Sequence, residues 1–449
     1  MSESTIFPPK DDSQQPKFCG APIIVGAGPS GLAVAASLRR FLVPSVILER
    51  SDGIAGLWRH RTYDRLNLHL PKPFCELPHL PFPADFPTYP SKDHFLEYLH
   101  AYADRFSLRP LFGCTVVDAR FDPAASLWRV TAIRRRNLPD DAPVRKVSPS
   151  SSSDSLTESS HSPSSSSSSS ETLRELELAE FASPWLVVAT GENAEPVVPE
   201  FKGLEAFKGS LLHSSEYKSG VEFTGKKVLV VGCGNSGMEI CVDLCEHGAM
   251  PFMSVRSGVH ILPREMLGSS TFGVAMKLLK WLPTRLVDRF LLIMAKMIIG
   301  DTEKYGLRRP KMGPLELKNT TGKTPVLDVG ALSLTKAGRI KIVPDVKSLT
   351  SNGAIFIDGE EMGFDAVVFA TGYKTNESDD VFTAEGKAKG TVTTNGCKGE
   401  NGIYFVGFTG KGLLGTSADA IRTALHISET WASKALKKQG SEPPPTSSK

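Results

Sequence analysis

Short apolar runs recur along this chain, and most of them end next to a glycine or a charged residue. The clearest runs lie at residues 23–25, 46–48, 185–188, 228–231, 252–255, 340–343, 366–369 and 403–406. Short runs bounded in this way are typical of buried strands in a parallel sheet, and helical segments separate several of them. The pattern therefore predicts an α/β protein.

Two of these runs lead directly into the pattern G-x-G-x-x-G, and a helical segment follows each copy. The glycines are Gly26, Gly28 and Gly31 in the first copy, and Gly232, Gly234 and Gly237 in the second. The first glycine permits a tight turn, the second lets the backbone approach a pyrophosphate, and the third lets the helix pack close to the strand. Two copies on separate strand–turn–helix units predict a Rossmann-like protein with two dinucleotide-binding domains.

The residue that ends the strand after each fingerprint differs between the two copies. Glu49 follows the first, where a carboxylate accepts hydrogen bonds from the ribose of FAD. Arg256 follows the second, where a guanidinium suits the 2′-phosphate of NADPH. We therefore expect FAD at the first site and NADPH at the second, although either residue could also be an ordinary charged strand end.

Composition excludes several classes of protein. A net charge of +3 on 449 residues gives no sign of a nucleic-acid partner. The seven cysteines show neither C-x-x-C redox spacing nor metal-ligand spacing, so we expect no metal and a reducing, cytoplasmic location.

The most apolar stretch, residues 272–299, contains Pro283 and several interspersed charged side chains. These charges interrupt it too often for a membrane span. We expect helices that break near Pro283 and form a packed insertion. The alternative is an amphipathic helix on a membrane surface, such as that of the endoplasmic reticulum.

The order of these features predicts an FAD-binding domain into which an NADPH-binding domain is inserted. We expect the FAD-binding domain at residues 19–217 and 374–435, the NADPH-binding domain at residues 218–373, and flexible tails at 1–18 and 436–449. Residues 148–170 are mostly serine and should form a disordered hairpin loop without a catalytic role. Each half carries a strand that ends in Ala-Thr-Gly, at 189–191 and 370–372.

Another motif lies between the two fingerprints. Residues 207–217 match F-x-G-x-x-x-H-x-x-x-Y, with Phe207, Gly209, His213 and Tyr217 at the fixed positions. The segment resembles the identifying motif of class B flavin-dependent monooxygenases, and tyrosine at its last position favours the flavin-containing branch over the Baeyer–Villiger branch. We interpret His213 as a linker residue that holds the two domains and NADP⁺ in register, rather than as a base.

Further segments resemble the YUCCA flavin monooxygenases of plants. They lie at residues 48–51, 58–66, 69–72, 189–194, 259–265, 323–330 and 369–374. The resemblance implies oxidative decarboxylation of indole-3-pyruvate to indole-3-acetic acid with NADPH and O₂, which is a step of auxin biosynthesis. Its partners would be a small 2-oxo acid and O₂. Trp58 joins the expected FAD-binding residues.

The flavin carries the chemistry in such enzymes, and the sequence shows no acid–base pair. The candidate catalytic residues are His69, which replaces an asparagine of other flavin-containing monooxygenases, and Asn193, which follows the first Ala-Thr-Gly. A helix expected at residues 416–430 follows a glycine-rich loop, and its N-terminus would stabilise negative charge on reduced flavin.

Three other functions compete with this interpretation. An N- or S-oxygenating monooxygenase acting on amines or thioethers shares the motif at 207–217 and differs only around 58–72 and 323–330. A disulfide reductase would need a C-x-x-C pair, which is absent. An NADPH sensor could lose the linker motif, which is intact here.

Overall fold

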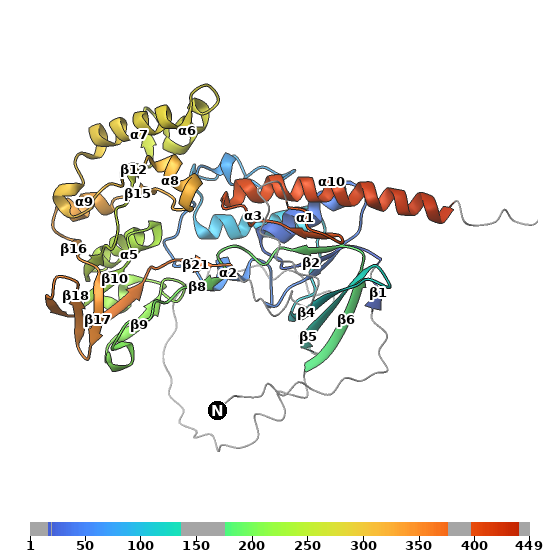
Figure 1. The fold of residues 1–449 in the computed structure, drawn as a ribbon, viewed down its shortest axis with the longest axis horizontal. Helices are drawn as coiled ribbons and strands as arrows, with labels where there is room; N and C mark the ends of the chain where they lie inside the picture. Colours follow the sequence, from blue (N-terminus) through green and yellow to red (C-terminus); the bar gives the residue numbers. More distant parts are fainter. Residues whose placement is uncertain (1–16, 19, 136–175, 376–396, 440–449) are drawn as a thin grey trace, which may run out of the picture.

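The computed structural model describes residues 17–18, 20–135, 176–375 and 397–439 (Figure 1). Its first parallel sheet has the strand order β22 (Ile403–Phe405), β7 (Leu186–Val188), β2 (Ile23–Val25) and β3 (Val46–Leu48). Successive residues of these strands face opposite sides of the sheet. Ile24 and Val187 therefore pack into one core, and Ile23 and Leu186 pack into another.

Helices cover one face of this sheet, and an antiparallel sheet covers the other. The helices are α1 (Pro29–Arg40), α3 (Lys92–Arg105) and α10 (Gly412–Gln439), with α1 packed along α10 (Figure 1). The antiparallel sheet contains β4 (Cys114–Asp122), β5 (Leu127–Arg135) and β6 (Leu176–Ser183), and β1 (Lys17–Phe18) pairs with β6.

The second parallel sheet repeats this three-layer plan. Its order is β16 (Lys341–Val343), β11 (Met250–Ser254), β10 (Lys227–Val231), β20 (Ala366–Phe369) and β9 (Ser210–His213). Helix α5 (Asn235–Glu246) covers one face. The antiparallel strands β17 (Val346–Thr350), β18 (Gly353–Phe356) and β19 (Glu361–Gly363) cover the other.

Strand β9 contains the middle of the linker motif and pairs with β20 along its whole length. The middle of the linker motif therefore forms an edge strand of the second sheet. A boundary drawn after residue 217 would separate this strand from its sheet, which is a reason to propose the boundary before Ser210.

A helical insertion follows β11. It contains β12 (Ile261–Pro263), β13 (Glu265–Met266), β14 (Ser269–Ser270), α6 (Thr271–Leu278), α7 (Thr284–Ile299), α8 (Pro314–Thr321), β15 (Val326–Asp328) and α9 (Ala331–Lys336). Pro283 is the N-cap residue of α7, so the predicted break is confirmed. Within the described ranges, no helix is long and apolar enough to cross a membrane.

The remaining elements are short and connect these layers. They are α2 (Gly56–His60), β8 (Glu195–Pro196), β21 (Tyr373–Lys374) and the 3₁₀ turns Lys72–Phe74, Leu204–Ala206, Gly220–Phe223 and Glu303–Tyr305. Helix α10 extends the helix expected at 416–430 in both directions and runs past residue 435. The serine-rich tract at 148–170 lies outside the described residues, between the antiparallel partners β5 and β6.

Candidate active site

The first fingerprint forms the connection from β2 to α1, and the backbone explains each of its glycines. Gly26 has a φ of +106°, and a Cβ there would lie 2.6 Å from the carbonyl oxygen of Ala189. A Cβ on Gly31 would lie 1.9 Å from the carbonyl oxygen of Gly26, so only glycine lets α1 approach this closely. A Cβ on Gly28 would meet no protein atom within 4 Å. Gly28 therefore borders open space, as a backbone position that approaches a pyrophosphate should.

The second fingerprint repeats this geometry between β10 and α5. Gly232 has a φ of +113°, and its Cβ would lie 2.4 Å from the carbonyl oxygen of Ala370. The Cβ of Gly237 would lie 2.1 Å from the carbonyl oxygen of Gly232, and Gly234 again borders open space. Because Ala189 and Ala370 belong to the two Ala-Thr-Gly segments, each segment packs against the first glycine of its own fingerprint.

A cavity of about 400 Å³ opens where β2, β3 and β7 end. Its lining includes five of the residues predicted to contact FAD or substrate, namely Gly26, Gly28, Glu49, Trp58 and Asn193. Gly412, Leu413 and Thr416 from the start of α10 also line it. A helix N-terminus at this position favours negative charge in the cavity.

Glu49 is buried at the edge of this cavity, and two backbone groups fix its carboxylate. The amide of Ala27 donates to Oε2 at 2.7 Å, and the amide of Ser51 donates to Oε1 at 2.8 Å. Each carboxylate oxygen accepts more than one hydrogen bond. Glu49 can therefore also accept the hydroxyl groups of a ribose.

Trp58 and Arg61 line the same cavity from α2 and the turn that follows it. The Trp58 ring contacts the edge of Phe95, with ring centroids 4.5 Å apart. Arg61 donates a hydrogen bond of 3.3 Å to the carbonyl oxygen of Ala194. The sequence analysis did not select Arg61, although it lies within one of the segments that resemble the plant enzymes.

Glu192 is a second lining residue that the sequence analysis missed. Burial raises the pKa of its carboxyl group, and hydrogen bonds from the amides of Gly410 and Gly412 partly oppose this shift. The Gly410 amide lies 2.9 Å from Oε2. The only signal for Glu192 in the sequence is its position directly after Ala-Thr-Gly, next to the predicted site residue Asn193.

The two candidate catalytic residues lie in different places. Asn193 is exposed and lines the cavity. His69 is not among the lining residues, and its Nε2 lies 3.1 Å from Oε1 of Glu239 on α5. The structure thus brings Asn193 to the predicted FAD site and brings His69 to the nucleotide-binding helix of the other half.

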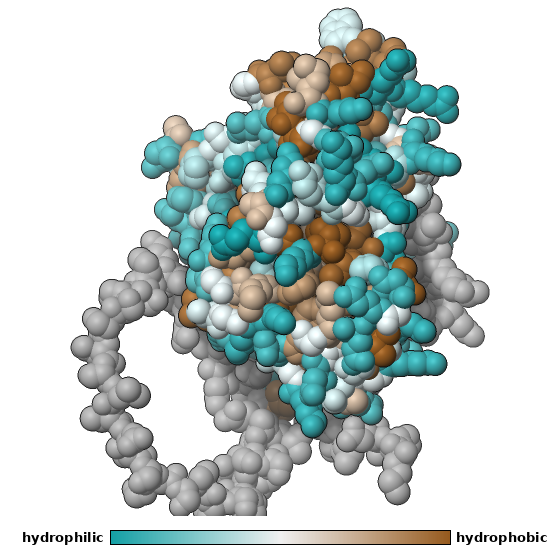
Figure 2. All heavy atoms as spheres, turned by 90° about the vertical axis from the view of Figure 1, so that its left-hand side faces the viewer, coloured by the Kyte–Doolittle hydropathy of each residue, from teal (hydrophilic) through white to brown (hydrophobic). Residues whose placement is uncertain are grey.

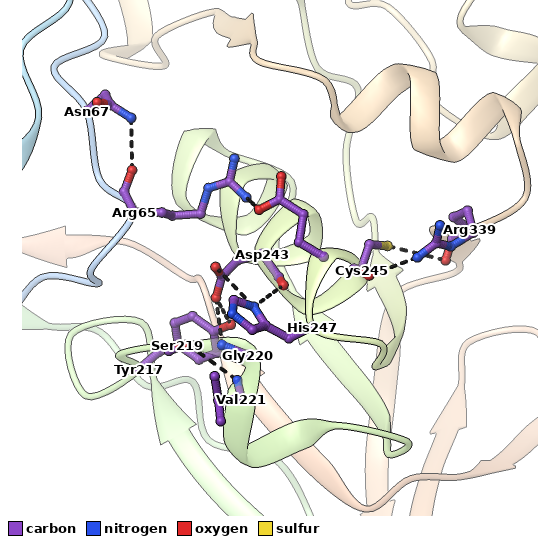
Figure 3. Close-up of polar contacts among 11 residues, drawn as sticks. Arg65, Asn67, Tyr217, Ser219, Gly220, Val221, Asp243, Cys245, His247 and Arg339 are labelled. Atoms are coloured by element: carbon purple, nitrogen blue, oxygen red, sulfur yellow. Dashed lines mark hydrogen bonds and ion pairs between the residues drawn. The ribbon is translucent and has the colours of Figure 1, made fainter. Parts of the chain in front are cut away.

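The linker motif packs against the second sheet. Phe207 joins the core beneath that sheet, and a Cβ on Gly209 would lie 2.4 Å from the carbonyl oxygen of Asp365. His213 is buried, with Nε2 3.1 Å from the carbonyl oxygen of Gly372. Burial lowers the pKa of His213, which the Gly372 carbonyl partly offsets. Tyr217 donates to Asp243 on α5, and Figure 3 shows Gly220 and His247 around the same carboxylate.

Arg256 is exposed and lies two residues after the end of β11. The amide of Gly232 donates to the carbonyl oxygen of Ser254, the last residue of that strand. Arg256 therefore follows the strand that borders the second fingerprint. Among the described residues, no group of three or more His, Cys, Asp or Glu side chains could hold a metal ion.

Comparison with known proteins gives consistent results. The chain is 59% identical over 418 residues to an indole-3-pyruvate monooxygenase, YUCCA8, of Oryza sativa subsp. indica, and the match covers 91% of each chain. It is 52% identical over 419 residues to a probable indole-3-pyruvate monooxygenase, YUCCA4, of Arabidopsis thaliana, covering 92% of this chain and 91% of that one. The solved structure of an oxidized steroid monooxygenase bound to NADP has a TM-score of 0.67 at 19% identity, with 92% of this chain and 85% of that chain covered.

The fold and the two fingerprints define a flavoprotein with two dinucleotide-binding halves. The sequence pattern of the flavin-binding monooxygenase-like family matches residues 21–130 and 171–378. The chain belongs to this family and, within it, to the YUCCA group, and it is a flavin-dependent monooxygenase, for which the sequence predicts FAD and NADPH as cofactors. The residues present fit these cofactors, because Gly28 and Gly234 both leave open the space that a side chain would fill.

Proposed function

We propose that this enzyme converts indole-3-pyruvate to indole-3-acetic acid with NADPH and O₂, as a step of auxin biosynthesis. The observation that carries the proposal is the 59% identity, over 91% of the chain, to a relative named for indole-3-pyruvate. The relative from Arabidopsis thaliana carries the same substrate in its name. Both matches are long enough to include the fingerprints and the linker motif.

In this proposal the backbone at Gly28 and the carboxylate of Glu49 hold FAD, with Trp58 beside it. The backbone at Gly234 and the guanidinium of Arg256 hold NADPH. FAD, when bound, supplies the oxidation chemistry by passing electrons from NADPH to O₂. The N-terminus of α10 stabilises negative charge at the cavity, and the apolar walls around Trp58 limit the access of water.

No side chain in this scheme needs to act as an acid–base pair. Asn193 is the candidate for a polar contact to substrate or NADP⁺, because it is exposed at the cavity. A direct catalytic role for His69 would require the pair that it forms with Glu239 to open.

We propose an FAD-binding domain formed by residues 19–209 and 374–439, which includes the end of α10, and an NADPH-binding domain formed by residues 210–373. The two parallel sheets support this division, since β22, β7, β2 and β3 share one sheet and β9 joins the other.

Turnover under ¹⁸O₂ tests the reaction directly. Purified enzyme with NADPH and indole-3-pyruvate should release CO₂ and form indole-3-acetate with one ¹⁸O atom in its carboxylate. An amine and a thioether should be run in parallel under the same conditions. The proposed decarboxylation would be rejected in favour of the N- or S-oxygenating alternative if the indole-3-acetate carried no ¹⁸O, or if only the amine or the thioether were oxygenated.

We further propose that the enzyme works in the cytoplasm, with the α6–α7 insertion in contact with a membrane surface. Trp281 between these helices is 87% exposed and Met297 on α7 is 74% exposed. Apolar residues gather at the top of the face shown in Figure 2, and hydrophilic residues lie among them. The basic side chains on and near these helices are Lys277, Lys280, Arg285, Arg289 and Lys296.

Exposed apolar and cationic side chains together suit an anionic lipid surface. The enzyme should sediment with vesicles that contain phosphatidylserine, and Trp281→Ser should weaken this. Equal recovery with and without vesicles would remove the proposal without affecting the assignment of the reaction.

A further inference from the structure

Helix α5 carries three carboxylates on one face. Glu239, Asp243 and Glu246 are spaced four and three residues apart, so their side chains share a face. Each receives a donor from outside the helix: Tyr63 and His69 reach Glu239, Tyr217 and the Gly220 amide reach Asp243, and Arg65 reaches Glu246. Figure 3 shows the contacts of Asp243 on this face.

Glu239 is one of the two buried carboxylates on this face, together with Asp243. Glu239 is 5% exposed, and each of its two carboxylate oxygens has a hydrogen-bond partner. The hydroxyl of Tyr63 donates to Oε2 at 2.6 Å, and Nε2 of His69 lies 3.1 Å from Oε1. Burial raises the pKa of Tyr63 well above its usual value, and the charge of Glu239 raises it further, so the phenol remains a donor. The two partners of Glu239 both come from the segment at residues 56–72.

That segment connects the two halves of the molecule. Its first part holds Trp58 and Arg61, which line the cavity. Its second part holds Tyr63, which is buried in the core of the NADPH-binding half. Lys218, directly after the linker motif, donates to the carbonyl oxygens of His60 and Thr62. Glu239 therefore connects the helix whose N-terminus follows Gly234 to the segment that forms part of the cavity wall.

We propose that Glu239 is a positioning residue for the reaction: its carboxylate fixes the segment at residues 56–72 against α5 and thereby sets the position of NADP⁺ relative to FAD. The helix that carries Glu239 faces the nicotinamide nucleotide with its N-terminus, and the segment that Glu239 holds lines the FAD cavity. If the contact between Glu239 and this segment shifts, the NADPH site should move relative to the FAD site. The proposal rests on membership of the flavin monooxygenase family and does not depend on the identity of the substrate.

The test measures NADP⁺ binding to the holoenzyme and peroxide release without substrate. The dissociation constant of NADP⁺ is obtained from the change in the flavin absorbance spectrum, and the fraction of consumed NADPH that appears as H₂O₂ is measured separately. Tyr63→Phe and Glu239→Gln should each weaken NADP⁺ binding about fivefold or more and raise the H₂O₂ fraction. The double variant should be no worse than the more affected single variant, because both changes act on the hydrogen bond between Tyr63 and Glu239.

Tyr102→Phe is the matched control. Tyr102 is equally buried and donates a hydrogen bond of 2.8 Å to the carbonyl oxygen of Pro78, but both residues lie on the FAD-binding side. It should lower the melting temperature as Tyr63→Phe does, with wild-type NADP⁺ binding and peroxide release. Glu239→Gln keeps the shape of the side chain, so it decides the question if Tyr63→Phe does not fold. The proposal would be overturned if Glu239→Gln kept wild-type NADP⁺ binding and peroxide release. It would also be overturned if Tyr102→Phe changed these two quantities as much as Tyr63→Phe does.

Discussion

The hydroxyl group of Tyr217 donates a hydrogen bond of 2.5 Å to Oδ2 of Asp243, and both residues are buried. The Gly220 amide donates to the same oxygen at 2.7 Å. The last residue of the linker motif is thus attached to the middle of the helix that begins at the second fingerprint. This contact fixes the point at which the chain enters the NADPH-binding half.

Removal of the Tyr217 hydroxyl should destabilise the enzyme. Tyr217→Phe leaves the buried Asp243 carboxylate with one partner fewer, which should lower the free energy of unfolding by about 1–3 kcal/mol. Denaturant unfolding of the holoenzyme measures this change. Tyr373→Phe is the comparison, because the Tyr373 hydroxyl is only half-buried and lies 3.3 Å from Ser214 Oγ. Equal stabilities of Tyr217→Phe and the wild type would show that the hydrogen bond contributes nothing.

Substitution at Gly28 should affect the ligand and not the fold. A methyl group there meets no protein atom within 4 Å, so Gly28→Ala should leave the melting temperature of the apoprotein unchanged while weakening FAD binding at least tenfold, or about 1.4 kcal/mol. Gly28→Glu adds a negative charge against the pyrophosphate and should abolish FAD binding. FAD titration of the apoprotein measures both effects.

Two other glycines serve as controls for this prediction. Gly234→Ala should leave FAD binding intact and weaken only NADPH binding, since Gly234 borders open space in the second fingerprint. Gly31→Ala should prevent folding, because its Cβ would lie 1.9 Å from a backbone oxygen. A Gly28→Glu protein that purifies with a full complement of FAD would contradict the assignment of the first site.

Most of the parallel strands and both fingerprints could be predicted from the sequence, because their signals are local. The strand runs around Ile24 and Val230 and the glycines after them each lie within a few residues. The contacts of Glu239 could not be predicted in this way, since its partners Tyr63 and His69 lie 176 and 170 residues away. No local pattern distinguishes such a carboxylate from a solvated one.

The sheet that β9 joins could not be predicted for a related reason. Residues 210–213 form a short edge strand, and only their pairing with β20, more than 150 residues later, shows which sheet they join. His69 was selected from its place in a family motif, which fixes its sequence position but not the direction of its side chain. Glu192 can be identified as a site residue only from its burial and its contact with Gly410.

Arg256 should determine the preference for NADPH over NADH. Arg256→Ala removes a charge-assisted contact to the 2′-phosphate, which should cost about 1.5–3 kcal/mol with NADPH and leave NADH nearly unaffected. Stopped-flow flavin reduction by each nucleotide measures this difference. Arg256→Lys keeps the charge without the guanidinium and should recover part of the preference. An equal loss with both nucleotides would mean that another residue reads the phosphate.

The burial of His213 should make stability depend on pH. Burial lowers the pKa of this side chain below its usual value of 6.5, so the unfolded chain binds a proton at a higher pH than the folded protein does. The free energy of unfolding should therefore fall as pH drops from 6.5 toward the folded pKa, with a slope of at most about 1.4 kcal/mol per pH unit from this residue.

His213→Asn should show a shallower slope over that range, even if its stability at pH 8 is lower. His60→Asn, at an exposed position, should keep the wild-type slope. Because burial also lowers the pKa of His260, the comparison rests on the difference in slope, and parallel curves for His213→Asn and the wild type would contradict the assignment.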